Sequence, residues 1–118
     1  MKLLVIGSRE VYDLGAKAKL RILELLEGDD PLFISGGARG VDSLAEDFIT
    51  KLDFPKLIIR PDYNKYGKSA PLVRDREMVE RADYVLAIWD GHSRGTKYTV
   101  DYARKLGKPC EIITVSRP

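Results

Sequence analysis

A regular alternation of short apolar runs with helically spaced segments constrains the fold most strongly. Strands that helices cover on both faces are nearly continuous in apolar and β-branched residues, rather than alternating apolar with polar ones. Five runs have this character, at residues 2–8, 31–37, 56–61, 84–91 and 110–116. The sequence therefore predicts five buried, parallel strands.

The segments between these runs carry apolar residues at helical spacing. Asp13 is expected to be the N-cap of the first helix, and Pro71 suits the first turn of the third. Apolar stripes mark four helices, at residues 14–26, 41–52, 71–82 and 99–106. The order βαβαβαβαβ predicts a single Rossmann-like α/β domain over residues 1–118, a three-layer α/β/α structure with a five-stranded parallel sheet.

Glycines concentrate at one predicted edge of this sheet. Ligands of open parallel sheets bind outside the carboxyl ends of the strands, near the point where the strand order reverses. The loops that follow the first four strands, 7–13, 36–42, 61–71 and 90–97, contain most of the glycines: Gly7, Gly36, Gly37, Gly40, Gly67, Gly91 and Gly95. The carboxyl edge is therefore the predicted functional edge.

The loop after the second strand reads SGGARGVD (35–42). It opens a helix, and backbone N–H groups at a helix N-terminus favour an anion such as phosphate. Its spacing matches neither the dinucleotide nor the Walker pattern, and a tight turn with glycine at positive φ is the alternative. Asp42 either complements the helix dipole, accepts hydrogen bonds from a ribose or orients Arg39. The predicted ligand contacts here are Gly36, Gly37, Arg39 and Gly40.

Three further segments are expected at the same edge. The loop DGHSRGT (90–96) repeats the glycine-bearing helix start, and GSR (7–9) supplies an arginine suited to bidentate phosphate binding. The long connection 61–71 carries tyrosines and lysines and is interpreted as a mobile lid whose rings stack on a base. These segments add the ligand-binding candidates Gly7, Ser8, Arg9, Tyr66, Lys68, Gly91, Ser93, Gly95 and Thr96, with Tyr63 and Lys65 also in the lid.

Taken in order, GSR…D, SGGARGVDSLAEDF, YGKSAPLVRDREM and ADYVLAIWDGHSRGT resemble the SLOG superfamily of Rossmann-like nucleotide-binding proteins, most closely its YspA-like, YpsA-related branch. GGARG is also similar to the Rossmann core of DprA, and the 91–96 loop to that of the LOG phosphoribohydrolases. The resemblance spans nearly the whole chain. It implies a nucleotide pocket with the 36–40 loop as one wall, the 91–96 loop on the phosphate side and residues 7–9 beside them.

The resemblance also bears on catalysis. Arg74 stands where LOG enzymes keep an arginine, but Thr99 replaces their glutamate and Asp75 their lysine. Asp42, Arg74 and Asp90 are the catalytic candidates, with the two aspartates as substitutes for the missing carboxylate. We expect a nucleotide-binding sensor or weak hydrolase. A LOG-like phosphoribohydrolase or ribosyltransferase and a DprA-like binder of single-stranded DNA remain as alternatives.

Composition narrows the partners. A net charge of +2 disfavours long nucleic acid, whereas a small anionic ligand needs only local positive groups. One cysteine and one histidine give no pattern for a metal site, and no cofactor is predicted. The N-terminal apolar run is too short for a signal peptide, which predicts a cytoplasmic protein without membrane association. A homodimer or larger homo-oligomer is implied only by the resemblance.

Overall fold

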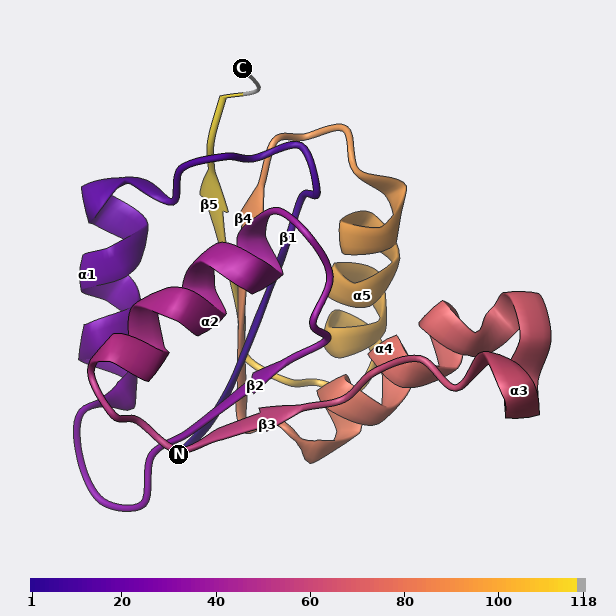
Figure 1. The fold of residues 1–118 in the computed structure, drawn as a ribbon, viewed down its shortest axis with the longest axis horizontal. Coiled ribbons are helices and arrows are strands. Elements are labelled where there is room, and N and C mark those ends of the chain that lie inside the picture. The colour runs from indigo at the N-terminus through magenta and orange to yellow at the C-terminus, as the bar shows by residue number, and fades with distance from the viewer. Residues whose placement is uncertain (117–118) are drawn as a thin grey trace.

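The computed structural model describes residues 1–116 and contains one all-parallel sheet (Figure 1). Its strand order is β3-β2-β1-β4-β5, so the order reverses between β1 and β4. The strands are β1 (Lys2–Gly7), β2 (Leu32–Ser35), β3 (Lys56–Ile58), β4 (Tyr84–Trp89) and β5 (Cys110–Thr114). The predicted five-stranded parallel sheet of a Rossmann-like α/β fold is thus confirmed.

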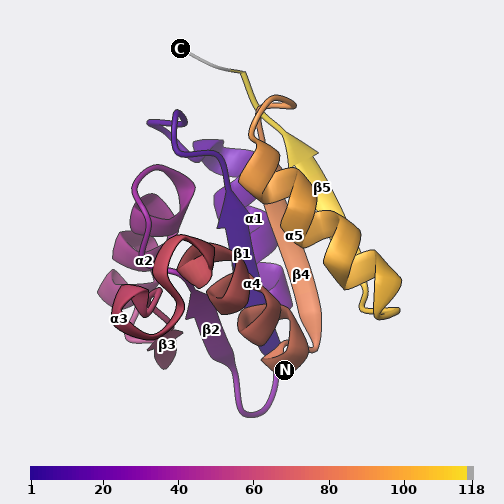
Figure 2. The same ribbon diagram turned by 90° about the vertical axis from the view of Figure 1, so that its right-hand side faces the viewer.

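Helices cover both faces of the sheet (Figure 2). On one face lie α1 (Gly15–Leu26) and α2 (Val41–Lys51), and on the other α4 (Ala70–Arg81) and α5 (Arg94–Lys105). A short helix, α3 (Tyr63–Tyr66), and a 3-10 turn, η1 (Gly67–Ser69), lie between β3 and α4. Three layers result, as the alternation of strands and helices predicts.

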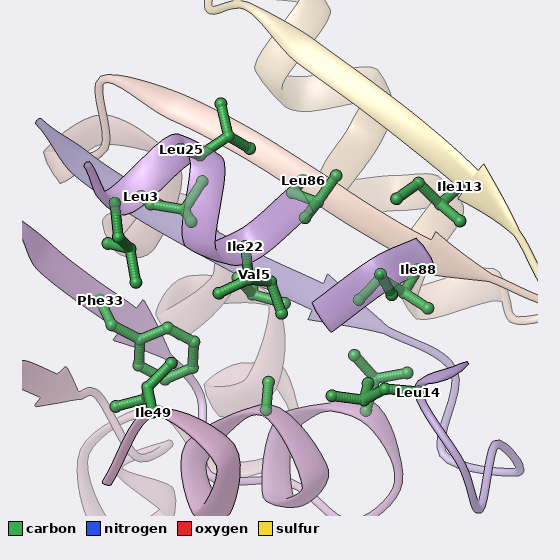
Figure 3. Packing of buried hydrophobic residues seen from close by; sticks show 14 of the residues in the cluster. Leu3, Val5, Leu14, Ile22, Leu25, Phe33, Ile49, Leu86, Ile88 and Ile113 are labelled. Carbon is green, nitrogen blue, oxygen red and sulfur yellow. The ribbon is translucent and has the colours of Figure 1, made fainter. Parts of the chain in front are cut away.

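Successive residues of each strand belong alternately to two separate hydrophobic clusters, one on each face of the sheet. Leu3 and Val5 of β1 pack beneath α1 and α2, together with Phe33 and Leu86 (Figure 3). Leu4 and Ile6 of β1 pack on the opposite face, against α4 and α5. Because both faces are filled by apolar side chains, polar groups can converge on a ligand only at the strand ends.

Three sequence-based details were wrong. Leu14, not Asp13, is the N-cap of α1; Asp13 lies one residue earlier, where its Oδ1 accepts a hydrogen bond from the N–H of Gly15 at 3.0 Å. The connection 61–71 is largely helical, because Asp62 caps α3 through a bond from the Lys65 N–H. The last helix begins at Arg94 rather than near residue 99, because Ser93 caps it. The side chains of Asp13, Asp62 and Ser93 accept hydrogen bonds from backbone N–H groups at these helix starts, and apolar periodicity does not detect such bonds.

Residues 1–116 contain neither a membrane-spanning helix nor a cluster of metal ligands. None of the helices there has the length and apolar character needed to cross a lipid bilayer. That same part of the chain brings together no group of three or more His, Cys, Asp or Glu side chains able to hold a metal ion.

Candidate functional site

Two adjoining cavities open at the carboxyl edge of the sheet. The small cavity has a volume of about 70 Å³ and the large cavity one of about 440 Å³. Arg9, Ala38 and Arg74 line both, so the two cavities adjoin at these three residues. The volume of the large cavity falls within the range of about 300–1,000 Å³ that is usual for small-molecule sites.

The two cavities differ in charge. The large cavity is lined by Gly36, Gly37, Ala38, Pro61, Tyr63 and four arginines, Arg9, Arg39, Arg60 and Arg74, and no acidic side chain takes part. The small cavity is lined by two carboxylates, Asp42 and Asp75, besides the shared arginines and residues Ile6, Gly7, Ala38, Met78, Ser93, Gly95, Thr96 and Thr99. The charged side chains that line the large cavity are therefore positive, whereas the small cavity is lined by both arginines and carboxylates.

Arg74 connects the two cavities from the first half of α4. Its side chain is only 7% exposed, and its Nε donates to Asp75 Oδ1 at 2.7 Å. Its Nη1 donates to the carbonyl of Gly36, also at 2.7 Å. A Cβ at Gly36 would lie 2.6 Å from that Nη1, so any other residue there would displace the guanidinium from this position. A buried arginine requires a partner for its charge, and Asp75 supplies that partner for Arg74.

Asp42 lies in the first turn of α2 and is buried. Its Oδ2 accepts a hydrogen bond from the N–H of Ala38 at 3.1 Å. Burial raises the pKa of Asp42 to about 6, outweighing the opposite effects of that bond and of the Arg74 charge. Asp42 does not orient Arg39, which instead forms an ion pair with Glu10 at 2.8 Å. Burial also raises the pKa of Asp75, against the influence of Arg74.

Two arginines of the large cavity are exposed and weakly held. The Arg39 side chain is 72% exposed and its partner Glu10 41%, and ion pairs this open contribute little to stability. Arg60 donates to the carbonyl of Gly37 at a long 3.3 Å. Both side chains can therefore exchange these partners for an anionic ligand at small cost.

The β4–α5 loop bonds most of its own donors. Asp90 Oδ1 accepts from the N–H groups of His92 and Ser93 at 2.8 and 3.1 Å. Ser93 Oγ accepts from the N–H of Thr96, and the Asp90 N–H donates to Ser8 Oγ. Asp90 and Ser8 therefore shape the loop, and neither lines a cavity.

The structure divides the sequence-predicted site residues into three groups. The small cavity contains Gly7, Arg9, Asp42, Arg74, Ser93, Gly95 and Thr96. The large cavity contains Arg9, Gly36, Gly37, Arg39 and Arg74. Neither cavity is lined by Ser8, Gly40, Tyr66, Lys68, Asp90 or Gly91. Of the two lid tyrosines, it is thus Tyr63, not Tyr66, that borders the large cavity.

Sequence reasoning missed Arg60 as a site residue and noted Asp75 and Thr99 only as departures from a resemblance. The third strand was predicted over residues 56–61, which hid Arg60 inside it, whereas β3 ends at Ile58 and leaves Arg60 in the loop at the carboxyl edge. Asp75 could not be found in this way, because it comes from α4 and reaches the edge only through helix packing.

The two adjoining cavities bring four guanidinium groups together with two carboxylates of raised pKa. Guanidinium groups bind phosphate through paired charge-assisted hydrogen bonds, and carboxylates of raised pKa are suited to proton transfer. Comparisons of the chain with protein-family models, with curated proteins and with solved structures gave no match.

Proposed function

We propose that this protein binds a nucleotide or nucleotide-derived ligand at the carboxyl edge of its sheet, with the phosphate group in the large cavity. One observation carries the proposal: four arginines and no acidic side chain line a cavity of about 440 Å³. Arginine presents a planar fork of donors that matches phosphate oxygens. Arg74 is paired with Asp75 and Arg39 with Glu10, but four guanidinium groups that face one cavity still favour an anionic ligand.

Two further features favour a nucleotide over a bare phosphate. Tyr63, which is 59% exposed, and Pro61 border the same cavity and offer an apolar surface on which a base can stack. The resemblance of the motifs to the SLOG superfamily implies the same class of ligand. The position at the edge where β1 and β4 mark the reversal of strand order is the usual place for such a ligand.

The arginine-lined cavity supports phosphate binding better than the β4–α5 loop does. The N–H groups of His92, Ser93 and Thr96 already donate to Asp90 and Ser93 side chains. A phosphate that used these three N–H groups would have to displace their bonds, and in the small cavity it would lie beside Asp42 and Asp75. On the arginines it replaces only an exposed ion pair and a long hydrogen bond.

Isothermal titration calorimetry with AMP, ADP, ADP-ribose and adenosine tests this proposal. We expect the phosphorylated compounds to bind and adenosine to bind at least about tenfold more weakly, as loss of charge-assisted bonds implies. Arg60→Gln is expected to weaken AMP binding, whereas Arg76→Gln, which removes an exposed arginine outside both cavities, should not. No binding at millimolar concentration would refute the proposal. Tight binding of oligonucleotides alone, with steep salt dependence, would favour the DNA-binding alternative.

A second candidate is hydrolysis of the N-glycosidic bond of that nucleotide. Two carboxylates with raised pKa, Asp42 and Asp75, lie beside Arg74 in the small cavity. A protonated carboxyl can donate to the departing base while an ionised one accepts a proton from the attacking water, so that the base and the ribose phosphate are released. Base release from AMP that vanishes in Asp42→Asn and Asp75→Asn would support it; release that is equal in both variants and the wild type would exclude these roles.

A further inference from the structure

The two adjoining cavities form a composite cavity with two chemically distinct halves. Arg39 and Arg60 contact only the large half, and Asp42 and Asp75 only the small one. Arg9 and Arg74 lie between them and line both. A ligand that spans both halves therefore needs an anionic group at one end and a group that carboxylates can accept at the other.

The carboxylates of the small half retain capacity to accept hydrogen bonds. A carboxylate has two oxygens with about four acceptor positions. Asp42 accepts from the backbone of Ala38 and Gly36, and Asp75 from the side chains of Arg74 and Thr99, so about half of the acceptor positions of each carboxylate are taken. The groups that satisfy the remaining positions best are neutral hydroxyl donors, since a second phosphate would be repelled.

The size of the small half fits such a group. One water molecule requires about 10–15 Å³ of cavity volume, so 70 Å³ admits several polar groups of that size. Gly95 contributes no side chain to this wall, and no atom lies within 4 Å of the position that a Cβ would take there. The wall is therefore open where a larger residue would intrude on a sugar ring.

We infer, on the basis of the proposed function, that the site selects ribonucleotides over deoxyribonucleotides, with Asp42 and Asp75 accepting hydrogen bonds from the sugar hydroxyls while the arginines hold the phosphate. Asp42 and Asp75 are then specificity-determining residues. Their negative charge weakens the binding of bare phosphate and strengthens the binding of a phosphate ester that carries hydroxyls. A site that bonds a substrate hydroxyl discriminates strongly against the analogue that lacks it.

Calorimetry with AMP, 2′-deoxy-AMP, 3′-deoxy-AMP and inorganic phosphate tests this inference. We expect AMP to bind at least about tenfold more tightly than one or both deoxy compounds, because each lacks a hydrogen bond to a charged acceptor. Equal affinity for all three nucleotides would overturn the inference and leave the proposed function intact. If neither AMP nor phosphate bound, both the proposed function and the inference would fall.

Variants separate selectivity from folding. Asp42→Asn and Asp75→Asn should each reduce the preference for AMP over its deoxy analogues and at the same time tighten the binding of inorganic phosphate. A merely structural role would weaken all ligands together, and that result would also overturn the inference. Asp47→Asn removes the same charge from an exposed position of α2 outside both cavities, and should leave both affinities unchanged.

Discussion

The two glycine-bearing loops at the carboxyl edge look alike in sequence and differ in what requires their glycines. In the β2–α2 loop, Gly40 has φ +76° and a Cβ there would lie 2.5 Å from the Cα of Arg9. In the β4–α5 loop, Gly91 has φ +83°, but Gly95 has neither a positive φ nor a neighbour within 4 Å of a Cβ position. Packing therefore accounts for Gly40 and backbone conformation for Gly91, whereas nothing in the fold accounts for Gly95.

This contrast separates residues that the fold requires from residues that it merely tolerates. Gly95 lies in the first turn of α5, where glycine is less favourable than alanine, and it lines the small cavity. Asp42 is also unfavourable for the fold, because its carboxylate is buried at the same edge of the sheet. Positions that are costly or unexplained for the fold, and that face a cavity, are the ones where function is expected.

The largest effect is expected where the fold requires glycine. In Gly7→Ala, the new Cβ would meet the carbonyl oxygen of Ile88 and lie 2.6 Å from the Cβ of Val41. Because both neighbours belong to the packed core, we expect a loss of about 3 kcal/mol or more in the free energy of unfolding. Urea denaturation measures it. Wild-type stability in this variant would contradict the close packing of β1 against α2.

Asp42→Asn is expected to raise stability at neutral pH. The folded protein keeps the Asp42 proton up to about pH 6, whereas the unfolded chain loses it near pH 4. Stability linked to this group is therefore present at low pH and lost as the pH rises through about 6. The variant should gain up to about 3 kcal/mol above pH 7 and nothing below pH 4. A gain independent of pH in urea denaturation would show that the buried charge is not its cause.

Gly95→Ala should raise the stability of the protein slightly and weaken its binding of AMP. The first turn of α5 becomes a better helix, so the free energy of unfolding rises by up to about 1 kcal/mol. The added methyl group narrows the small cavity, so affinity for AMP falls. Gly91→Ala is the matched control in the same loop: its positive φ predicts lower stability. Unchanged AMP affinity in Gly95→Ala would remove Gly95 from the site.

Arg39→Gln is expected to change stability least. The Arg39–Glu10 pair is exposed, so its loss should alter the free energy of unfolding by less than about 0.5 kcal/mol. AMP affinity should nevertheless fall, because Arg39 lines the large cavity. Lys105→Gln, at an exposed position near the C-terminal end of α5, is the control for the loss of one positive charge. Equal AMP affinity in Arg39→Gln and Lys105→Gln would show that Arg39 does not contact the ligand.

The fold was predictable because it depends on patterns that extend over many residues. The apolar runs and helical stripes were sufficient to predict the parallel sheet. Strands that are buried on both faces, such as β1 and β4, are nearly continuous in apolar residues. The site was predictable where it comes from the strand ends and the helix starts that follow them, as for Arg9 and Asp42, and the resemblance pointed to Arg74. Asp75 and the role of Asp90 depend on single hydrogen bonds and helix packing, which have no sequence period.

A crystal structure with AMP bound tests the central claim most directly, because the phosphorus atom marks the position of the phosphate. We predict density for the phosphate in the large cavity, within hydrogen-bonding distance of Arg39 or Arg60, with the ribose turned toward Asp42 and Asp75. A phosphate bound instead by the backbone of residues 91–96, with the arginines still paired as they are without ligand, would contradict this account.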